Sequence, residues 1–334
     1  MEGKGYISKI DSEEIKCNLD RIWFLPHFEI TNPNKPNKLR IVFDASARSN
    51  GVSLNDFLLT GPDLYNSLQN ILLNFRIKKF AFTSDIKEMF LRIKVRKEDR
   101  ISQRILYRGM ERTKQPDIYE INVFFFDSTC GPCLAQEAKN SNAQDFSQYY
   151  PKAAEDIIDA HYMDDYLGGA DTAEEAAEII NDVIYVHSKG NFEICNWIAN
   201  DSNILKDVDD RLLADCKKKC DKNESSNERI VGIWWGPKND TFTFKINFHK
   251  IDKSLLDTGR KPSKREVLKV VMWIFDLLGF LANFIVQGKI LLQDIWRSKI
   301  DWDDDISDNL YMKWTEWIDD QKIFITSNFH DNFA

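Results

Sequence analysis

The stretch His161-Tyr-Met-Asp-Asp-Tyr-Leu-Gly-Gly169 places two adjacent carboxylates between apolar and aromatic residues. This pattern predicts a strand, a tight turn and a second strand, with Asp164 and Asp165 at the turn. Adjacent carboxylates in an apolar hairpin repel each other, and a divalent cation would neutralise that repulsion. The sequence therefore predicts a hairpin with a metal-binding turn.

A third acidic residue ends another apolar strand. Residues 80–85 alternate between two faces, and the last of them is Asp85. An Asp at the end of a buried strand is costly unless it is paired or bound to a metal ion, although a capping or turn Asp is the common alternative. Together with Asp164 and Asp165, it would supply the oxygen ligands of a two-metal phosphoryl-transfer site. The wide separation along the chain does not establish that the three carboxylates meet.

Other segments of the chain occur in an order typical of one protein family. They are Leu25-Pro-His-Phe28, Lys38-Leu-Arg-Ile-Val-Phe-Asp-Ala-Ser46, Ser53-Leu-Asn-Asp-Phe-Leu-Leu-Thr-Gly-Pro62, Phe82-Thr-Ser-Asp-Ile-Lys-Glu-Met-Phe-Leu-Arg-Ile93, Tyr162-Met-Asp-Asp165, Arg229-Ile-Val-Gly-Ile-Trp-Trp235, Lys261-Pro-Ser-Lys-Arg-Glu-Val-Leu268 and Lys289-Ile-Leu-Leu-Gln-Asp-Ile-Trp296. Over about residues 5–320 the chain resembles the reverse transcriptase region of a BEL/Pao-type long-terminal-repeat retrotransposon polyprotein.

The resemblance implies an α+β fold of the right-hand polymerase type, with an antiparallel palm sheet flanked by helices and a helical C-terminal part. Residues 1–80 would form the fingers and the start of the palm. Residues 81–240 would form the palm, with the catalytic carboxylates, a primer-grip-like hairpin and a fingers insertion at about 100–130. Residues 241–334 would form a helical thumb-like or connection-like region.

The resemblance also assigns roles to individual residues. It implies that Asp85, Asp164 and Asp165 bind metal and are catalytic. The residues that it implies for nucleotide binding are Lys38, Arg40, Ile86, Phe90, Asp127 and Pro132, and those for the primer grip are Val231 and Gly232. Lys38 and Arg40 would clamp the triphosphate, a role that suits the planar fork of an arginine. Phe90 would lie under the sugar and select deoxynucleotides, with a plain core phenylalanine as the alternative.

The implied activity is RNA-directed DNA polymerisation with two Mg²⁺ ions, for which Mn²⁺ could substitute. The implied partners are an RNA or DNA template–primer and deoxynucleoside triphosphates, with no membrane; the oligomeric state is not predicted. The expected location is the cytoplasm, in the virus-like particle of a parent element, or the nucleus. We expect a fragment that lacks the ribonuclease H and integrase regions.

Three positions depart from the family pattern. Asp127 stands where a Gly is expected, and a carboxylate there would add bulk and repel phosphates. Asn196 stands where relatives often have a basic residue, and Leu277 replaces an expected Pro. These departures leave open an alternative, a decayed or domesticated polymerase fold that binds nucleic acid without catalysis.

Two further alternatives rest on short motifs. Asp257-Thr-Gly259 resembles the motif of an aspartic peptidase, but basic residues follow at once where a peptidase dyad needs an apolar floor. Cys130 and Cys133, with Cys216 and Cys220, have zinc-like spacing. Unrelated free thiols are the favoured interpretation of these cysteines.

Composition and charge limit the remaining possibilities. A length of 334 residues is typical of two domains, and six Cys favour a reducing compartment. The longest apolar stretch, residues 270–286, is interrupted by polar residues and is short for a membrane span. Residues 1–125 carry 21 Lys and Arg against 16 Asp and Glu, whereas residues 126–334 carry 24 against 37. From charge alone a solvated face is the favoured interpretation, whereas the resemblance implies that the basic zone at 245–269 lies near the thumb and faces the phosphate backbone.

Spacing and turn signals predict the following secondary structure. We expect a hairpin over residues 21–43, helical structure at 53–75, 143–160 and 173–186, a hairpin over 228–246, and a capping box at Ser263 before helices that reach Ser298.

Overall fold

The computed structural model describes residues 1–10, 21–32, 35–214, 227–243 and 251–326. The chain divides into two compact units. The N-terminal unit comprises Met1–Ile198 and Asn203–Asp215, and the C-terminal unit comprises Ala199–Ser202 and Cys216–Ala334. The fold is mixed α+β, with antiparallel sheets in both units and helices toward the C-terminus.

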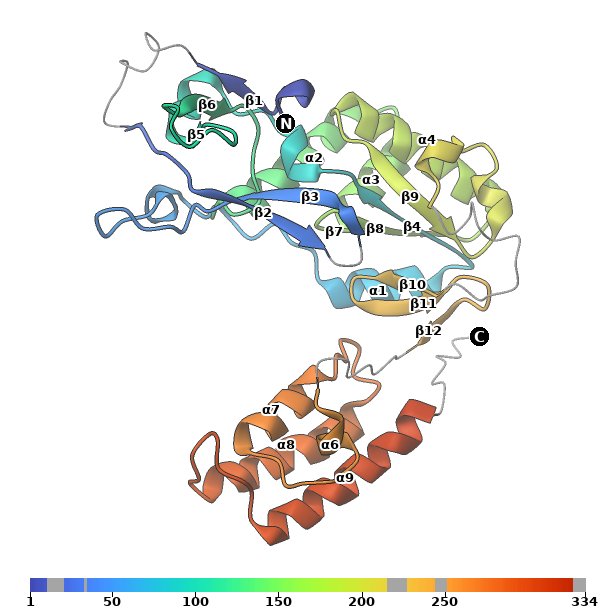
Figure 1. The fold of residues 1–334 in the computed structure, drawn as a ribbon. Coiled ribbons are helices and arrows are strands. Elements are labelled where there is room, and N and C mark those ends of the chain that lie inside the picture. Colours follow the sequence, from blue (N-terminus) through green and yellow to red (C-terminus); the bar gives the residue numbers. More distant parts are fainter. Residues whose placement is uncertain (11–20, 33–34, 215–226, 244–250, 327–334) are drawn as a thin grey trace. The chain divides into compact units, whose positions relative to one another are not determined.

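A four-stranded sheet organises the N-terminal unit (Figure 1). The strands of this unit are β1 (Ile7–Lys9), β2 (His27–Asn32), β3 (Lys35–Phe43), β4 (Phe80–Ile86), β5 (Arg104–Tyr107), β6 (Asp117–Ile121), β7 (His161–Tyr162), β8 (Asp165–Ala170) and β9 (Ile194–Ala199). The four-stranded sheet has the order β7-β8-β4-β9, β2 pairs with β3, and β1-β6-β5 form a third sheet.

The central pair of strands is antiparallel and closely packed. Phe82 is fully buried on β4 and lies opposite Gly168 on β8. A Cβ at Gly168 would lie 2.4 Å from the Phe82 ring, so only glycine leaves room for this ring. The packing fixes the register, and a slip of one residue would move every side chain to the other face.

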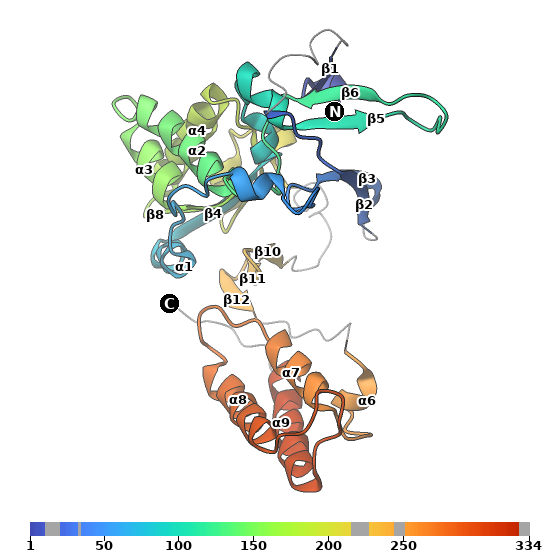
Figure 2. The same cartoon turned by 90° about the vertical axis from the view of Figure 1, so that its left-hand side faces the viewer.

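Helices pack against this sheet (Figure 2). The helices of the unit are α1 (Leu68–Ile77), α2 (Gly131–Phe146), α3 (Pro151–Asp159) and α4 (Ala173–Lys189), with short 3-10 helices that include η4 (Leu54–Phe57) and η5 (Met89–Arg92). The apolar positions of α4 recur with helical spacing and are buried, and the Thr172 hydroxyl caps its first turn at Glu175 N. The three helices α2, α3 and α4 contact one another, and α1 and α4 contact β8.

The C-terminal unit joins a small antiparallel sheet to a helical core. Its elements are β10 (Glu228–Ile230), β11 (Ile233–Gly236), β12 (Thr241–Thr243), α6 (Lys253–Leu256), α7 (Lys264–Trp273), α8 (Ala282–Arg297) and α9 (Asp308–Thr326). Buried aliphatic residues and the tryptophans Trp314 and Trp317 form the core of α6–α9. The Ser263 capping box at the start of α7 is present as predicted.

Two predicted helices differ from the structure. Over residues 53–75 only η4 and the start of α1 are helical, because Gly61 has a φ of +76° and Pro62 follows it. The helix predicted at 143–160 is two helices, since Pro151 begins a second one, and the first starts as early as Gly131. The hairpin over 21–43 and the helix at 173–186 are present in the described residues. The hairpin predicted over 228–246 is three strands in its described part, β10, β11 and β12, because the chain also turns at Val231 and Gly232. No helix that the structure describes is both long and apolar enough to cross a membrane.

Candidate active site

The three acidic residues singled out from the sequence lie at one end of the β4–β8 pair. Asp85 faces Asp165 directly in the antiparallel register. Asp164 belongs to the turn between β7 and β8, and its carbonyl accepts a hydrogen bond from Ile86 N (2.8 Å). Met163, just before it, has a φ of 57°, which gives the turn its tight bend. The fold thus brings together residues that lie far apart in the sequence.

The carboxylates at this turn are held in an unfavourable electrostatic state. Burial and the neighbouring charges of Asp164 and Asp85 raise the pKa of Asp165 to about 7. Burial also raises the pKa of Asp164, although its tip reaches solvent. Such shifts indicate negative charge that the surrounding protein does not neutralise, a pattern frequent at functional sites.

The side chain of Asn196 contacts the third carboxylate. Its amide donates a hydrogen bond of 2.5 Å to Oδ1 of Asp85. Asn196 lies on β9, the neighbour of β4, and has a φ of 58°, a backbone conformation that Asn tolerates better than most residues. The sequence singled out Asn196 only as a departure from the family pattern, and the contact with Asp85 was not predicted.

The donor atoms at this turn suit a hard divalent cation, because carboxylate oxygens are the ligands that Mg²⁺ prefers. The raised pKa of Asp165 also fits, since a bound cation would offset the repulsion among the three carboxylates. As they stand, however, the described residues include no group of three or more His, Cys, Asp or Glu side chains arranged as metal ligands. The backbone register brings the carboxylates together without a finished ligand geometry.

A second group of predicted residues surrounds Phe90. Its ring on η5 packs edge-on against Phe126, with centroids 5.3 Å apart, and Phe126 is 78% exposed. A Cβ at Gly131 would lie 3.3 Å from Phe90 Cε1, so the start of α2 also touches this ring. Pro132 occupies the first turn of α2. Phe90 is therefore only partly buried and belongs to a surface aromatic pair.

Asp127 has a structural contact that the sequence did not indicate. Its Oδ2 accepts a hydrogen bond from Ala45 N (2.8 Å), just after β3. Asn55 on η4 adds two links to the same loop, because its amide donates to Asp127 O (3.0 Å) and its Oδ1 accepts from Thr129 N (2.9 Å). One oxygen of the carboxylate that was expected to repel phosphates is thus already used to join two segments of the N-terminal unit.

The other predicted nucleotide-binding residues lie on the strands. Arg40 is exposed on β3, opposite Ile30. Lys38 belongs to the same strand, but its side chain lies outside the described part of the chain. Ile86 is buried at the end of β4, and its backbone N–H donates to Asp164 O at the turn.

Val231 and Gly232 form the turn between β10 and β11 in the C-terminal unit. Both have positive φ values, 43° and 93°. A Cβ at Gly232 would lie 3.0 Å from a ring carbon of Phe275, so the turn packs closely against the segment after α7. The structure therefore has a hairpin turn at these two residues, and their role as a primer grip stays a prediction.

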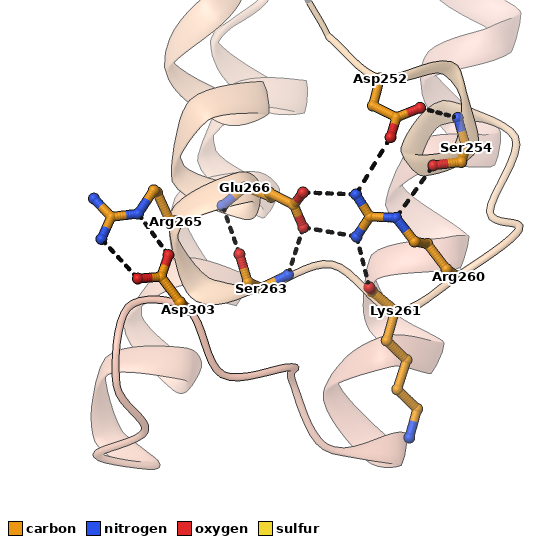
Figure 3. A network of polar contacts seen from close by, with 8 residues as sticks. All are labelled: Asp252, Ser254, Arg260, Lys261, Ser263, Arg265, Glu266 and Asp303. Carbon is orange, nitrogen blue, oxygen red and sulfur yellow. Dashed lines mark hydrogen bonds and ion pairs between the residues drawn. The ribbon is translucent and has the colours of Figure 1, made fainter.

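The sequence predicted free positive charge in the basic zone at 245–269, but two of its arginines are paired with carboxylates. Arg260 forms a two-pronged pair with Glu266 (2.6 and 2.9 Å) and also reaches Asp252 (Figure 3). Arg265 pairs with Asp303 in the same way (Figure 3). The charges that were expected to face phosphate are thus partly balanced within the unit; Lys245 and Lys250 lie outside the described residues.

The peptidase and zinc alternatives gain no support. Asp257 is exposed at the end of the short helix α6, where an aspartic peptidase needs a buried carboxylate dyad. Cys130 and Cys133 are free thiols, whereas Cys216 and Cys220 lie outside the described residues.

Comparison with known proteins gives a family match for part of the C-terminal unit and a structural likeness for most of the chain. Residues 263–327 match the family model described as a Pao retrotransposon-like RNaseH-like domain. The match covers less than half of the chain and falls on α7, α8 and α9. The expectation that the chain lacks a ribonuclease H region is therefore too broad, because this family description applies to its helical C-terminal part. No curated protein matches the chain.

Among solved structures, the chain resembles a foamy viral protease–reverse transcriptase in complex with double-stranded DNA. The TM-score is 0.59 at 14% sequence identity, over 95% of this chain and 45% of that one. The chain thus spans less than half the length of the viral protein. At this identity the likeness shows the fold alone, which is that of a retroviral reverse transcriptase structure.

Proposed function

We propose that the chain is the RNA-directed DNA polymerase part of a BEL/Pao-type retrotransposon polyprotein, with fingers, palm and thumb-like regions as predicted from the sequence. The observation that carries the proposal is the register of β4 and β8, which sets Asp85 opposite Asp165 and beside Asp164. The raised pKa of Asp165 supports it, because a catalytic metal site concentrates negative charge in this way.

In this proposal Asp85, Asp164 and Asp165 hold two divalent cations, which supply charge neutralisation at the transferring phosphoryl group. Phe90 lies beneath the sugar of the incoming deoxynucleotide and, with Phe126, excludes a 2′-hydroxyl. Arg40 and Lys38 bind the triphosphate, Ile86, Asp127 and Pro132 border it, and Val231 with Gly232 supports the primer end. The partner is an RNA or DNA template–primer, held through its backbone so that base pairing selects the nucleotide.

Primer extension on an RNA template with Mg²⁺ and deoxynucleotides tests the proposal. We expect extension by the wild-type chain and none by the Asp164→Asn/Asp165→Asn variant. Asp145→Asn is a matched control, because Asp145 is exposed on α2, away from the turn. Equal extension by the wild type and the double variant would show that another site, or a contaminating enzyme, is responsible.

A second candidate is a non-catalytic polymerase fold that binds nucleic acid. The contact between Asn196 and Asp85 favours it, because an amide already holds one oxygen that a metal ion would need. Folded protein that binds primer–template in a filter-binding assay, yet shows no Mg²⁺-dependent extension, would select this candidate over the polymerase.

A further inference from the structure

Two cysteines begin helix α2 in the sequence Cys130-Gly-Pro-Cys133. Cys130 is the N-cap residue of α2, and Cys133 is its third helical residue. Both are free thiols and both are partly exposed. A Cys-X-X-Cys pair at the start of a helix is the arrangement of reversible dithiol–disulfide pairs in redox proteins.

The geometry of a helix N-terminus brings these two positions together. In a capping box, the N-cap side chain binds the backbone N–H of the third helical residue, and the side chain of that residue binds the backbone N–H of the N-cap. This chain shows it twice with other residues, at Ser53 with Asp56 and at Ser263 with Glu266. In α2 the same two positions carry thiols, and the side chain of Cys130 makes no capping hydrogen bond.

Burial raises the pKa of the Cys130 thiol, hydrogen bonds at Cys130 and Ser128 act to lower it, and the charge of Cys133 adds a smaller increase. The spacing of the two side chains is therefore the stronger argument for a bond between them. Side chains three residues apart on a helix have Cβ atoms about 5–6 Å apart, whereas a disulfide needs roughly 3.5–4.5 Å. A small movement at the N-cap therefore suffices to form the bond.

The surroundings connect this pair to the proposed nucleotide pocket. Gly131, between the two cysteines, touches the Phe90 ring and Ser128. On the other side, the Cys133 sulfur packs against Gly61, since a Cβ there would lie 2.5 Å from it. Because Cys130 directly follows the loop that carries Phe126 and Asp127, movement at the N-cap is transmitted to that loop.

We propose that Cys130 and Cys133 form a reversible disulfide by exchange with a low-molecular-weight disulfide. One thiolate attacks the external disulfide, which gives a mixed disulfide and releases one external thiol. The second cysteine attacks the protein sulfur of that mixed disulfide and releases the other external thiol. The two protein thiols are thereby oxidised, the external disulfide is reduced to two thiols, and the two cysteine protons pass to the released thiolates.

The consequence for catalysis rests on the proposed function. Closing the disulfide draws the N-cap toward the helix and shifts the loop that packs on Phe90. We therefore expect the oxidised form to bind deoxynucleotides more weakly, with a KM several-fold higher and a smaller change in kcat.

The chemical test uses the full chain equilibrated with oxidised glutathione and then alkylated. The tryptic peptide Gln115–Lys139 contains these two cysteines and no others. We expect mass spectrometry to find this peptide two hydrogens lighter, and dithiothreitol to restore it. In Cys133→Ser the peptide should instead carry a stable glutathione on Cys130. Cys195→Ser is the matched control, because Cys195 is the remaining described cysteine, and it should leave the disulfide unchanged.

The proposal is overturned if the peptide stays reduced, keeps glutathione on both cysteines, or is linked to another cysteine. This readout needs no polymerase activity, so it stands apart from the proposed function. Primer extension then tests the coupling: the KM for deoxynucleotides should rise on oxidation of the wild type and stay constant in Cys130→Ser/Cys133→Ser. A disulfide that forms without a change in KM would contradict the link to the pocket.

Discussion

Under the polymerase proposal, the amide of Asn196 orients Asp85 for the metal ion, whereas under the non-catalytic alternative it occupies an oxygen that the metal ion would need. Replacing Asn196 by Gly removes the hydrogen bond to Asp85 but tolerates the positive φ at this position. A hydrogen bond to a charged group contributes about 1.5–3 kcal/mol, so we expect kcat to fall on the order of tenfold or more and a higher Mg²⁺ concentration at half-maximal rate.

Primer extension over a Mg²⁺ titration measures both quantities for this variant. The control is Asn181→Gly, which removes an amide contact to Ala177 on the exposed side of α4. An increase in kcat or in Mg²⁺ affinity in Asn196→Gly would mean that the amide competes with the metal instead of positioning Asp85.

Lys139 is a buried lysine on α2. Its side chain is fully buried, and its ammonium group donates to the carbonyl of Ile157. Burial lowers the pKa of Lys139 to about 7, against a charge on Asp159 that acts to raise it. Burial, followed by the Lys139 charge, also lowers the pKa of the neighbouring His187 to about 3.

The shift at Lys139 predicts a pH dependence of stability. Between pH 7 and about 10.5 the unfolded chain binds more protons at this residue than the folded one, so the free energy of unfolding rises with pH in that window. Below about pH 7 the folded state carries the full cost of a buried charge. We therefore expect Lys139→Met to be more stable than the wild type below pH 7, with an advantage that shrinks toward pH 10.5. Urea unfolding at several pH values measures this difference, and a constant difference would refute the assignment.

At the residue scale, local sequence predicted the acidic turn, and the metal-binding role inferred for it stays a prediction. The three carboxylates stood out because Asp in an apolar strand or hairpin is costly without a partner. The contacts of Asn196 with Asp85 and of Asp127 with Ala45 were not predictable, because each joins residues far apart in the sequence. A polar residue whose hydrogen-bond partner lies in another element leaves no mark on the local hydrophobic pattern from which helices and strands are predicted.

At the scale of elements, the close packing of α8 and α9 depends on Gly288. A Cβ there would lie 2.8 Å from Trp317 Cζ2 and 3.1 Å from Val271 Cγ2. The Trp317 ring cannot yield easily, because it stacks on Phe284 at 4.9 Å and its Nε1 donates to Phe284 O. Alanine improves helix propensity by about 1 kcal/mol, but overpacking costs about 1–3 kcal/mol.

We therefore expect Gly288→Ala to lower the free energy of unfolding of the C-terminal unit by about 1–2 kcal/mol. Lys289→Ala, one residue further along the same helix and exposed, is the control and should have little effect. Trp317→Phe in the Gly288→Ala background should recover part of the loss. Chemical denaturation followed by tryptophan fluorescence gives these values, and a Gly288→Ala variant as stable as the wild type would show that the helices can move apart without cost.

Elements with strong local signals were predicted better than those set by packing. The capping box at Ser263 and the periodic helix α4 were identified correctly because their signals lie within a few residues. The helix expected over 53–75 is present as an α-helix only from Leu68 on, because apolar spacing continued through Gly61 and Pro62 although the backbone there is not helical. Before Leu68, Leu54 is buried, whereas Phe57 and Leu59 are exposed, so the apolar residues there do not mark one buried helix face.

At the scale of the whole molecule, each unit contains a hydrophobic cluster of its own. The core of α6–α9 draws only on residues of the C-terminal unit, and the core around Phe43 and Ile121 only on the N-terminal unit. The acidic turn belongs to the N-terminal unit, whereas seven of the nine tryptophans belong to the C-terminal unit. Most tryptophans therefore report on the C-terminal unit, whereas the proposed metal site belongs to the N-terminal unit.

This separation predicts two distinguishable unfolding transitions. In the proposed site Mg²⁺ binds the folded carboxylates and not the unfolded chain, so it should raise the midpoint of the unfolding transition of the N-terminal unit, which far-UV circular dichroism records together with that of the C-terminal helices. The midpoint of the transition seen by tryptophan fluorescence should change little with Mg²⁺, and it should be lower in Gly288→Ala than in the wild type. In Asp165→Asn the Mg²⁺ effect should shrink, because one ligand of the site is lost. A single transition, coincident for both probes and shifted equally by Mg²⁺ and by Gly288→Ala, would instead show that the two units unfold as one cooperative body.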